Sequence, residues 1–238
     1  MRRAIMAGLF LAISLSKMAG QSGQIVQVPV APVTILWMSD TSGNYIRNPA
    51  VLLKAGNGQA DLSGKDLCYL TNGGGQKSSM IFDFGTELQG SLRIVTGMAE
   101  TKKPVVLRIR FGESVSETLS ETDSSTSTAT NDHAMRDFQI TLPWLGSIET
   151  GNSGFRFVRI DLLGENSTAL LKEVNAISKY RDIPQSGSFR CNDEQLNMIW
   201  ETGARTVHLR KAIFKGTAAH RLNISEKSKA ICSFFPSR

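Results

Sequence analysis

The chain has 238 residues, of which 41% are hydrophobic, so it can bury the core of one large domain or two small ones. Its formal net charge is +6, but residues 210–238 hold seven basic residues against one acidic residue, which leaves 20 of the 27 basic and 20 of the 21 acidic residues elsewhere. Because the rest of the chain is neutral and the basic segment has no base-reading pattern, the charge does not indicate nucleic-acid binding.

The first twenty residues have the pattern of an export signal. Arg2 and Arg3 precede an apolar run from Ala4 to Leu15, and small and polar residues follow. At twelve residues, the run is too short to span a membrane. We therefore predict that residues 1–20 are a signal peptide and that the protein is periplasmic or extracellular. The alternative is that the run forms a buried core helix.

Residues 25–185 are predicted to form one domain that is mainly β. Short segments rich in β-branched and aromatic residues alternate with clusters of Gly, Asn, Ser and Pro, as in strands joined by turns. These segments are 33–38, 79–84, 91–96, 105–111, 155–162 and 172–180. The pattern favours an antiparallel β-sandwich of the jelly-roll or concanavalin-like kind.

Two of these segments carry enough information to orient their side chains. In segment 105–111, three apolar residues share one face and Arg108 and Arg110 share the other, which predicts a half-buried strand with solvated arginines. In segment 155–162, Phe155 and Phe157 lie opposite the later apolar residues. Apolar groups on both faces predict a strand at the centre of a sheet.

The three cysteines are too few and too widely separated for a disulfide framework or a metal site. We predict two buried free thiols, at Cys68 and Cys191. A bridge between them is the alternative in an oxidising compartment.

Clustered carboxylates raise the question of a calcium site. Glu113, Glu117 and Glu121 recur every four residues, and Asp123 and Asp132 follow. Hard cations prefer such oxygen ligands, but like charges on one face repel each other in the absence of a cation. We expect a solvated acidic loop, and we predict no metal and no cofactor.

Three residues are candidate carbohydrate contacts: Trp144 in the string PWLGS, His133 in NDHAMRD, and Glu113. An indole ring can pack against the face of a pyranose. A lone histidine is more often a structural hydrogen-bonding residue than a base or a ligand. Because no nucleophile string of the form G-x-S-x-G occurs, we predict no Ser-His-Asp site.

Residues 186–209 are predicted to form a linker and a first helix. Asn192 is the expected N-cap, with Gln195 in the capping-box position. One face of the helix then carries Leu196, Ile199, Trp200, Gly203 and Val207. An isolated helix of this length is marginal in water, so this face needs a partner. Self-association through the face is one expectation.

The ordered series FDFGTELQG, RIRFGES, NDHAMRDFQITLP, GFRFVRIDL and RDIPQSGSFRCNDEQLNMIWETGARTVHL resembles a segment of bacterial, Bacteroides-type α-L-rhamnosidases. In those enzymes the segment joins an accessory β-sandwich to the catalytic six-hairpin α/α barrel. The resemblance runs from Met80 to Leu209. It implies that the two carboxyl groups for inverting hydrolysis come from the barrel, so this chain alone is expected to be inactive.

The chain departs from that family's pattern at Arg210, where an atypical basic tail, residues 210–238, begins. The change of composition indicates a frameshift or a premature stop in a longer reading frame. Reading the coding DNA past codon 209 in the other frames tests this hypothesis. The resemblance implies a parent enzyme that hydrolyses terminal α-L-rhamnosides of plant or bacterial glycans. The alternative is a free-standing carbohydrate-binding or adhesion module.

Overall fold

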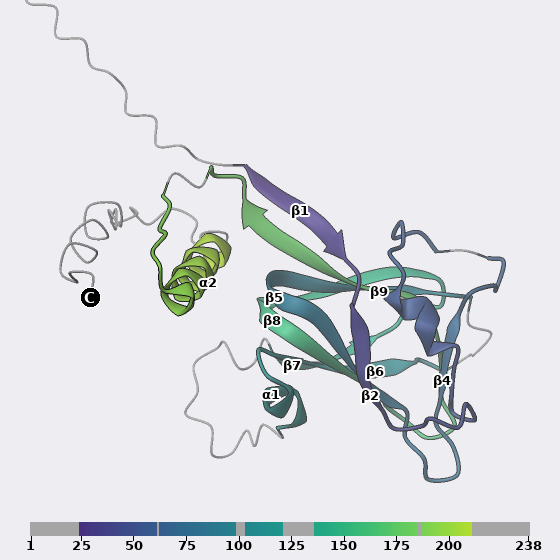
Figure 1. Cartoon of the computed structure of the whole chain (residues 1–238). Coiled ribbons are helices and arrows are strands. Elements are labelled where there is room, and N and C mark those ends of the chain that lie inside the picture. Colours follow the sequence, from purple (N-terminus) through teal and green to yellow (C-terminus); the bar gives the residue numbers. More distant parts are fainter. Residues whose placement is uncertain (1–23, 61, 99–102, 121–135, 185–186, 211–238) are drawn as a thin grey trace, which may run out of the picture.

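The computed structural model describes residues 24–60, 62–98, 103–120, 136–184 and 187–210 (Figure 1). Its strands are β1 (Ile25–Val30), β2 (Thr34–Met38), β3 (Ile46–Arg47), β4 (Cys68–Thr71), β5 (Ser79–Thr96), β6 (Val106–Gly112), β7 (Asp137–Thr141), β8 (Gly146–Leu162) and β9 (Thr168–Arg181). Its helices are the 3-10 helix η1 (Pro49–Leu53), α1 (Val115–Leu119) and α2 (Glu194–Arg210). The predicted class is confirmed: an antiparallel β-sandwich followed by a C-terminal helix.

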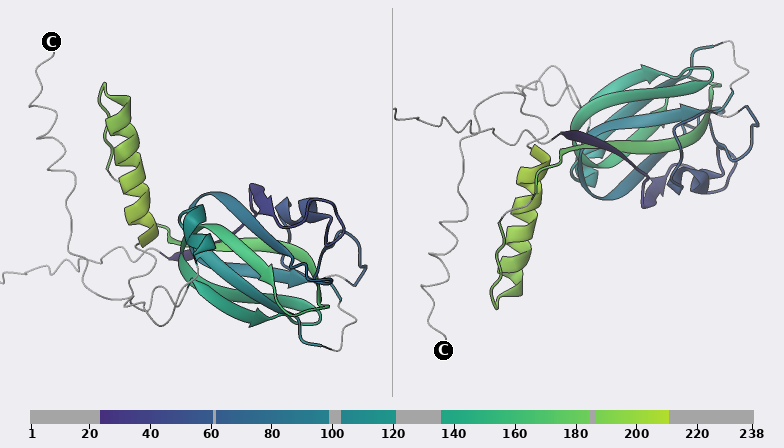
Figure 2. Two further views of the ribbon diagram at one scale, coloured as in Figure 1. Left: turned by 90° about the horizontal axis from the view of Figure 1, so that it is seen from below. Right: turned by 90° about the horizontal axis from the view of Figure 1, so that it is seen from above.

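The strands form two layers because β5 and β8 pass from one layer into the other (Figures 1 and 2). Residues 79–83 of β5 pair with residues 157–161 of β8, and β2 adds to the other side of β5. Farther along, residues 88–96 of β5 pair with residues 146–155 of β8 and with β9. β6 and β7 extend the first layer, whereas in the second layer β1 and β4 pair with β9 and β3 pairs with β4.

The core lies between the layers and is apolar. Leu107, Ile109 and Phe111 of β6 enter it from one strand, as the alternation predicts. The ring of Phe111 stacks on that of Phe155, with centroids 4.3 Å apart, and Phe138 meets Phe111 edge-on. Complete burial of one such side chain contributes about 1.5–3 kcal/mol, so this aromatic group is a main stabiliser of the fold.

One detail of the predicted alternation in β8 is wrong. Phe155 lies in the core beside Val158, although the sequence places it on the opposite face. The pairing is irregular at this point, since Asp83 pairs with Phe157 while Leu88 pairs with Phe155. Because β8 passes into the other layer here, the side of the strand that faces the core changes. β8 lies between β5 and β6, which confirms its predicted central place.

Helix α2 stands beside the sandwich and does not lie flat on it (Figure 2). Its N-cap is Asp193, one residue after the predicted Asn192, because the Asp193 Oδ1 accepts hydrogen bonds from the N–H groups of Gln195 and Leu196 at 2.9 and 3.3 Å. On the predicted apolar face, Trp200 stacks on Phe189, with ring centroids 6.4 Å apart. The remaining large apolar residues of that face are exposed: Leu196, Ile199 and Val207.

Among the described residues, a ring contact and an arginine join α2 to the sandwich. The His208 ring lies against that of Tyr180 in β9, with centroids 5.7 Å apart. The Arg205 guanidinium donates hydrogen bonds to the Thr86 hydroxyl at 2.6 Å and to the Glu87 carbonyl at 3.2 Å. Among the described helices, none is long and apolar enough to cross a membrane.

Candidate functional site

A pocket of about 260 Å³ opens at one end of the sandwich, where β5 and β7 end and β6, β8 and β9 begin. Four of its lining residues are almost fully buried: the apolar Val105, Leu142 and Ala169, and the polar Thr96. Trp144 and Thr141 are exposed and form the rim, with Lys103 and Thr168. The sequence candidate Trp144 therefore lines the pocket, with its side chain 65% exposed.

Buried groups hold the loop that carries Trp144. The Thr96 hydroxyl, at the end of β5, lies 3.2 Å from the carbonyl oxygens of both Pro143 and Gly146 and shares its proton between them. The N–H of Leu142 donates to the Val105 carbonyl at 2.8 Å. Gly146 has a φ of 133°, which favours glycine, so the chain can turn directly into β8. The loop is thus fixed on both sides of Trp144.

The pocket lies at the opposite end of the sandwich from α2. β9 begins in the pocket at Thr168 and reaches α2 at Tyr180 (Figure 1). At about 3.3 Å per residue, these two ends are separated by up to about 40 Å of strand. The pocket therefore faces away from the helix through which the chain continues.

The other two carbohydrate candidates are not part of this pocket. Glu113 follows the far end of β6, and its carboxylate accepts a hydrogen bond from Arg136 at 2.7 Å. The same guanidinium binds Glu117 at 3.0 Å, which places a cation of the protein between the two carboxylates. This arrangement makes Glu113 and Glu117 partners of the same arginine. His133 lies outside the described residues.

The remaining acids of the predicted loop, Glu121, Asp123 and Asp132, also lie outside the described residues. The loop is not wholly irregular, since its first part forms α1, with Ser114 as N-cap accepting from the Glu117 N–H at 3.4 Å. Within the described ranges, no group of three or more His, Cys, Asp or Glu residues is placed to hold a metal ion.

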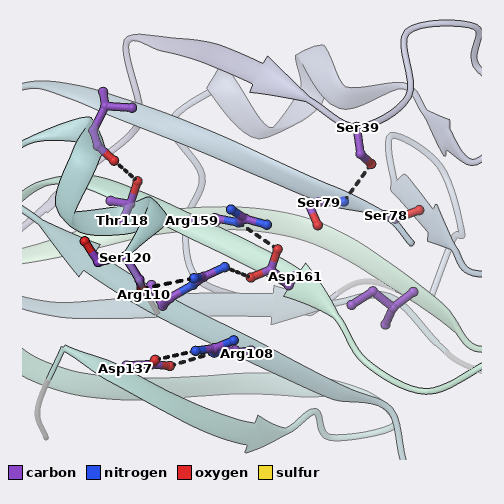
Figure 3. Close-up of polar contacts among 12 residues, drawn as sticks. Ser39, Ser78, Ser79, Arg108, Arg110, Thr118, Ser120, Asp137, Arg159 and Asp161 are labelled. Atoms are coloured by element: carbon purple, nitrogen blue, oxygen red, sulfur yellow. Dashed lines mark hydrogen bonds and ion pairs between the residues drawn. The ribbon is translucent and has the colours of Figure 1, made fainter. Parts of the chain in front are cut away.

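An ion-pair network covers the outer side of the first layer (Figure 3). Asp161 of β8 accepts from Arg110 and from Arg159, both at 2.8 Å. Arg110 also donates to the Ser120 carbonyl just after α1, and its side chain is only 3% exposed. The prediction of a solvated arginine is therefore wrong for Arg110. Arg108, paired with Asp137 at 2.6 Å, is 24% exposed.

These contacts hold the carboxyl groups in their ionised form. Burial alone raises the pKa of Asp161, but hydrogen bonds from Ser79, Arg110 and Arg159 outweigh it and lower the pKa below its ordinary value. The bidentate hydrogen bonds from Arg156 likewise lower the pKa of Asp83. A general acid in glycoside hydrolysis needs a raised pKa, so the arrangement suits these groups to structural ion pairs.

Sequence reasoning missed a buried polar cluster on β9. Glu173 is 4% exposed, and its Oε2 accepts from the N–H of Gly58 at 3.0 Å and from the Asn175 amide at 3.2 Å. A Cβ on Gly56 would lie 1.8 Å from the Glu173 carboxyl carbon. The only signal in the sequence is the pair of closely spaced glycines, which lets the backbone pass directly over the buried carboxylate.

Both described cysteines are free. Cys68 is buried, and burial raises the pKa of its thiol to about 12, which makes it unreactive. Cys191 is partly exposed, so the prediction of two buried thiols is confirmed for Cys68 and wrong for Cys191.

No protein-family model matches the chain, and no curated protein matches its sequence. Among solved structures, a rhamnosidase from Klebsiella oxytoca with rhamnose bound is similar, with a TM-score of 0.55 and 14% sequence identity over 79% of this chain and 36% of that chain. At this identity the likeness shows a shared fold. The chain spans 36% of the length of the Klebsiella enzyme.

Two further solved structures are similar at lower TM-scores. A GH78 family rhamnosidase of Bacillus sp. GL1 has a TM-score of 0.48 and 19% identity, over 68% of this chain and 16% of that chain. The C-terminal domain of a chitobiase from Bacteroides fragilis has a TM-score of 0.42 and 9% identity, over 66% of this chain and 100% of that chain.

Proposed function

We propose that this chain is the non-catalytic, accessory β-sandwich of an exported glycoside hydrolase of the α-L-rhamnosidase type, with α2 leading toward the catalytic domain. The observation that carries the proposal is the extent of the structural match. The span from Ile25 to Arg181 makes up about two thirds of the chain, whereas the likeness to the Klebsiella enzyme covers 79% of the chain. The match is thus longer than this span, which supports the proposal.

The carboxyl groups of the sandwich agree with a non-catalytic role. Inverting hydrolysis needs a protonated acid and a second carboxylate about 6.5–9.5 Å away that activates water. Asp83 and Asp161 are instead bound to arginines that keep their pKa values low. Such groups stay ionised near neutral pH and cannot protonate a leaving oxygen.

Hydrolysis of an aryl α-L-rhamnoside by the purified chain tests the proposal. We expect no release of the aryl group above the buffer background. A mock preparation, purified in the same way from cells that do not express the chain, is the control for a contaminating enzyme. Release above that of the mock preparation would overturn the proposal.

A free-standing carbohydrate-binding or adhesion module is the second candidate function. The pocket with the exposed Trp144 favours it, because a concave site with an aromatic rim is suited to a sugar ring. The two candidates differ in whether the sandwich needs another domain. An accessory sandwich requires a catalytic domain in the same polypeptide, whereas a binding module holds its glycan with full affinity by itself.

A further inference from the structure

We propose that Asn57 is a site of self-catalysed modification, at which the protein converts its own asparagine amide into a carboxylate. The site lies in the segment 54–60, hereafter the strap, which follows η1 and passes over the buried carboxylate of Glu173 in β9. Asn57 is exposed in the strap, and Gly58 follows it. The modification needs only the folded sandwich, so it is independent of the proposed function.

The sequence contains two asparagines that are followed by glycine, Asn57 and Asn72. In such a pair, the backbone nitrogen of the glycine can attack the side-chain carbonyl carbon of the asparagine, because the glycine has no side chain to obstruct the approach. The immediate sequence therefore makes the two sites equivalent. The structure gives them different surroundings.

Two hydrogen bonds at Asn57 suit the reaction. The Gly58 N–H donates to the Glu173 Oε2 at 3.0 Å, so a carboxylate already holds the proton that the attacking nitrogen must lose. The Gln59 N–H donates to the Asn57 Oδ1 at 3.0 Å, which folds the side chain over the following peptide. The same N–H stabilises the negative charge that develops on Oδ1 during the attack.

Further contacts hold the strap over its base. The Lys172 Nζ donates to the Gln59 carbonyl at 3.0 Å. On the other side, a Cβ on Gly58 would lie 2.7 Å from the guanidinium carbon of Arg93, so the strap backbone rests on that group. The Gly58 nitrogen and the Glu173 carboxylate are thus kept in contact before the reaction begins.

The reaction needs water as its only co-reactant. The Gly58 nitrogen bonds to the Asn57 Cγ while its proton passes to Glu173. The bond from Cγ to the amide nitrogen then breaks, and that nitrogen takes the proton from Glu173 and leaves as ammonia. Water opens the resulting cyclic imide at either carbonyl, which gives aspartate or isoaspartate. Glu173 ends in the state in which it began.

Asn72 lacks these conditions. Its side chain is buried, at 3% exposure. Its Nδ2 donates to the backbone carbonyls of Leu162 and Gly164 at 2.8 and 2.9 Å, so the nitrogen that would have to leave is held by two acceptors. The Gly73 N–H donates to the carbonyl of Gln76, and a peptide carbonyl is too weak a base to take its proton. We therefore expect Asn72 to be stable in the folded protein.

The experiment is prolonged incubation of the purified full chain near neutral pH, followed by peptide mapping with mass spectrometry. Exchange of ammonia for water raises the mass of the peptide, and isoaspartate separates from aspartate in chromatography. We expect Asn57 to react about tenfold faster than Asn72, or more, in the folded protein. In guanidinium chloride, where the fold is lost, the two asparagines should react at similar rates.

A variant at Glu173 tests the role of the base. Glu173→Gln removes the base but keeps an oxygen that accepts from the Gly58 N–H, so it should slow the reaction at Asn57 about tenfold or more. Glu201→Gln makes the same change at an exposed position of α2 and should have no effect. Asn72 reports on folding in the same sample, because unfolding would let it react.

Two results would overturn the proposal. One is a rate at Asn57 in the folded protein that is no higher than the rate at Asn72. The other is an unchanged or higher rate at Asn57 in E173Q while Asn72 stays intact. If E173Q unfolds, Glu173→Asp takes its place, since it keeps the charge but draws the carboxylate back by one methylene, and it should slow the reaction in the same way.

Discussion

At the scale of single residues, the buried pair of Arg110 and Asp161 shows how a local pattern is overruled by its surroundings. The alternation in β6 correctly places Arg110 on the outer side of its layer. Helix α1 and Ser120, which follow β6 in the chain, pack over that side of the layer. An arginine that the alternation places at the surface is thereby buried, and it pairs with Asp161.

We expect Asp161→Asn to destabilise the protein by about 3 kcal/mol at pH 7, because it removes the carboxylate that pairs with the buried Arg110 guanidinium. Asp137→Asn is the matched control, since Arg108 and Asp137 form a similar pair that is more exposed, and its loss should cost about 1 kcal/mol or less. Urea denaturation measures both. Equal costs for the two variants would contradict this account.

The same pair predicts a pH dependence. The pKa of Asp161 is lower in the folded protein than in the unfolded chain, so its contribution is fully present above about pH 4, the unfolded value. It is lost as the pH falls through the lower, folded pKa. The difference in unfolding free energy between wild type and D161N should therefore shrink below pH 4, and a constant difference would show that Asp161 remains ionised.

At the scale of elements, the sequence predicts where strand segments lie but does not predict which of them join into one longer strand. Segments 79–84 and 91–96 read as two strands because Gly85 and Gly90 lie between them. The structure joins them into the single strand β5, in which Gly85 has a φ of 80° and allows the change of layer. Alternation is local and so visible in the sequence, whereas a change of layer depends on the partner strands.

The pocket is unpredictable for the same physical reason. Its lining comes from connections around residues 97, 105, 143 and 168, which only the fold brings together. The sequence singled out Trp144 because an apolar ring stood in a short loop. Nothing near Trp144 in the sequence indicated that Thr96, almost fifty residues earlier, holds that loop.

A substitution at Gly90 tests how closely β5 packs on β9. A Cβ at Gly90 would lie 1.9 Å from the Ile177 carbonyl oxygen of β9, a backbone atom that cannot rotate away. Gly90→Ala should therefore cost about 2–3 kcal/mol through strain. Gly73→Ala, where the nearest atom is 3.7 Å from the added Cβ, should change stability by no more than about 0.5 kcal/mol. Thermal unfolding compares them, and a well-tolerated G90A would show that β5 and β9 can separate.

At the scale of the whole molecule, the sandwich and α2 differ in how fully they are packed. The sandwich encloses an aromatic and aliphatic core, whereas α2 meets it through one ring contact and one arginine. Helices of this length take most of their stability from burying an apolar face. In α2 that face is open to solvent at Leu196, Ile199 and Val207. The sandwich leaves this apolar face of α2 uncovered, so another surface is needed to bury it.

A second copy of the chain can bury the apolar face of α2 when no other partner is present. Apolar stripes of two α2 helices bury each other, so we expect reversible association that grows with concentration. Leu196→Glu places a charge in the stripe and should weaken association about tenfold or more, since burying an unpaired carboxylate is costly. Leu62→Glu makes the same change at an exposed leucine in a loop and should have no effect. Sedimentation velocity at several concentrations measures this, and a wild-type monomer at all of them would show that α2 does not pair with itself.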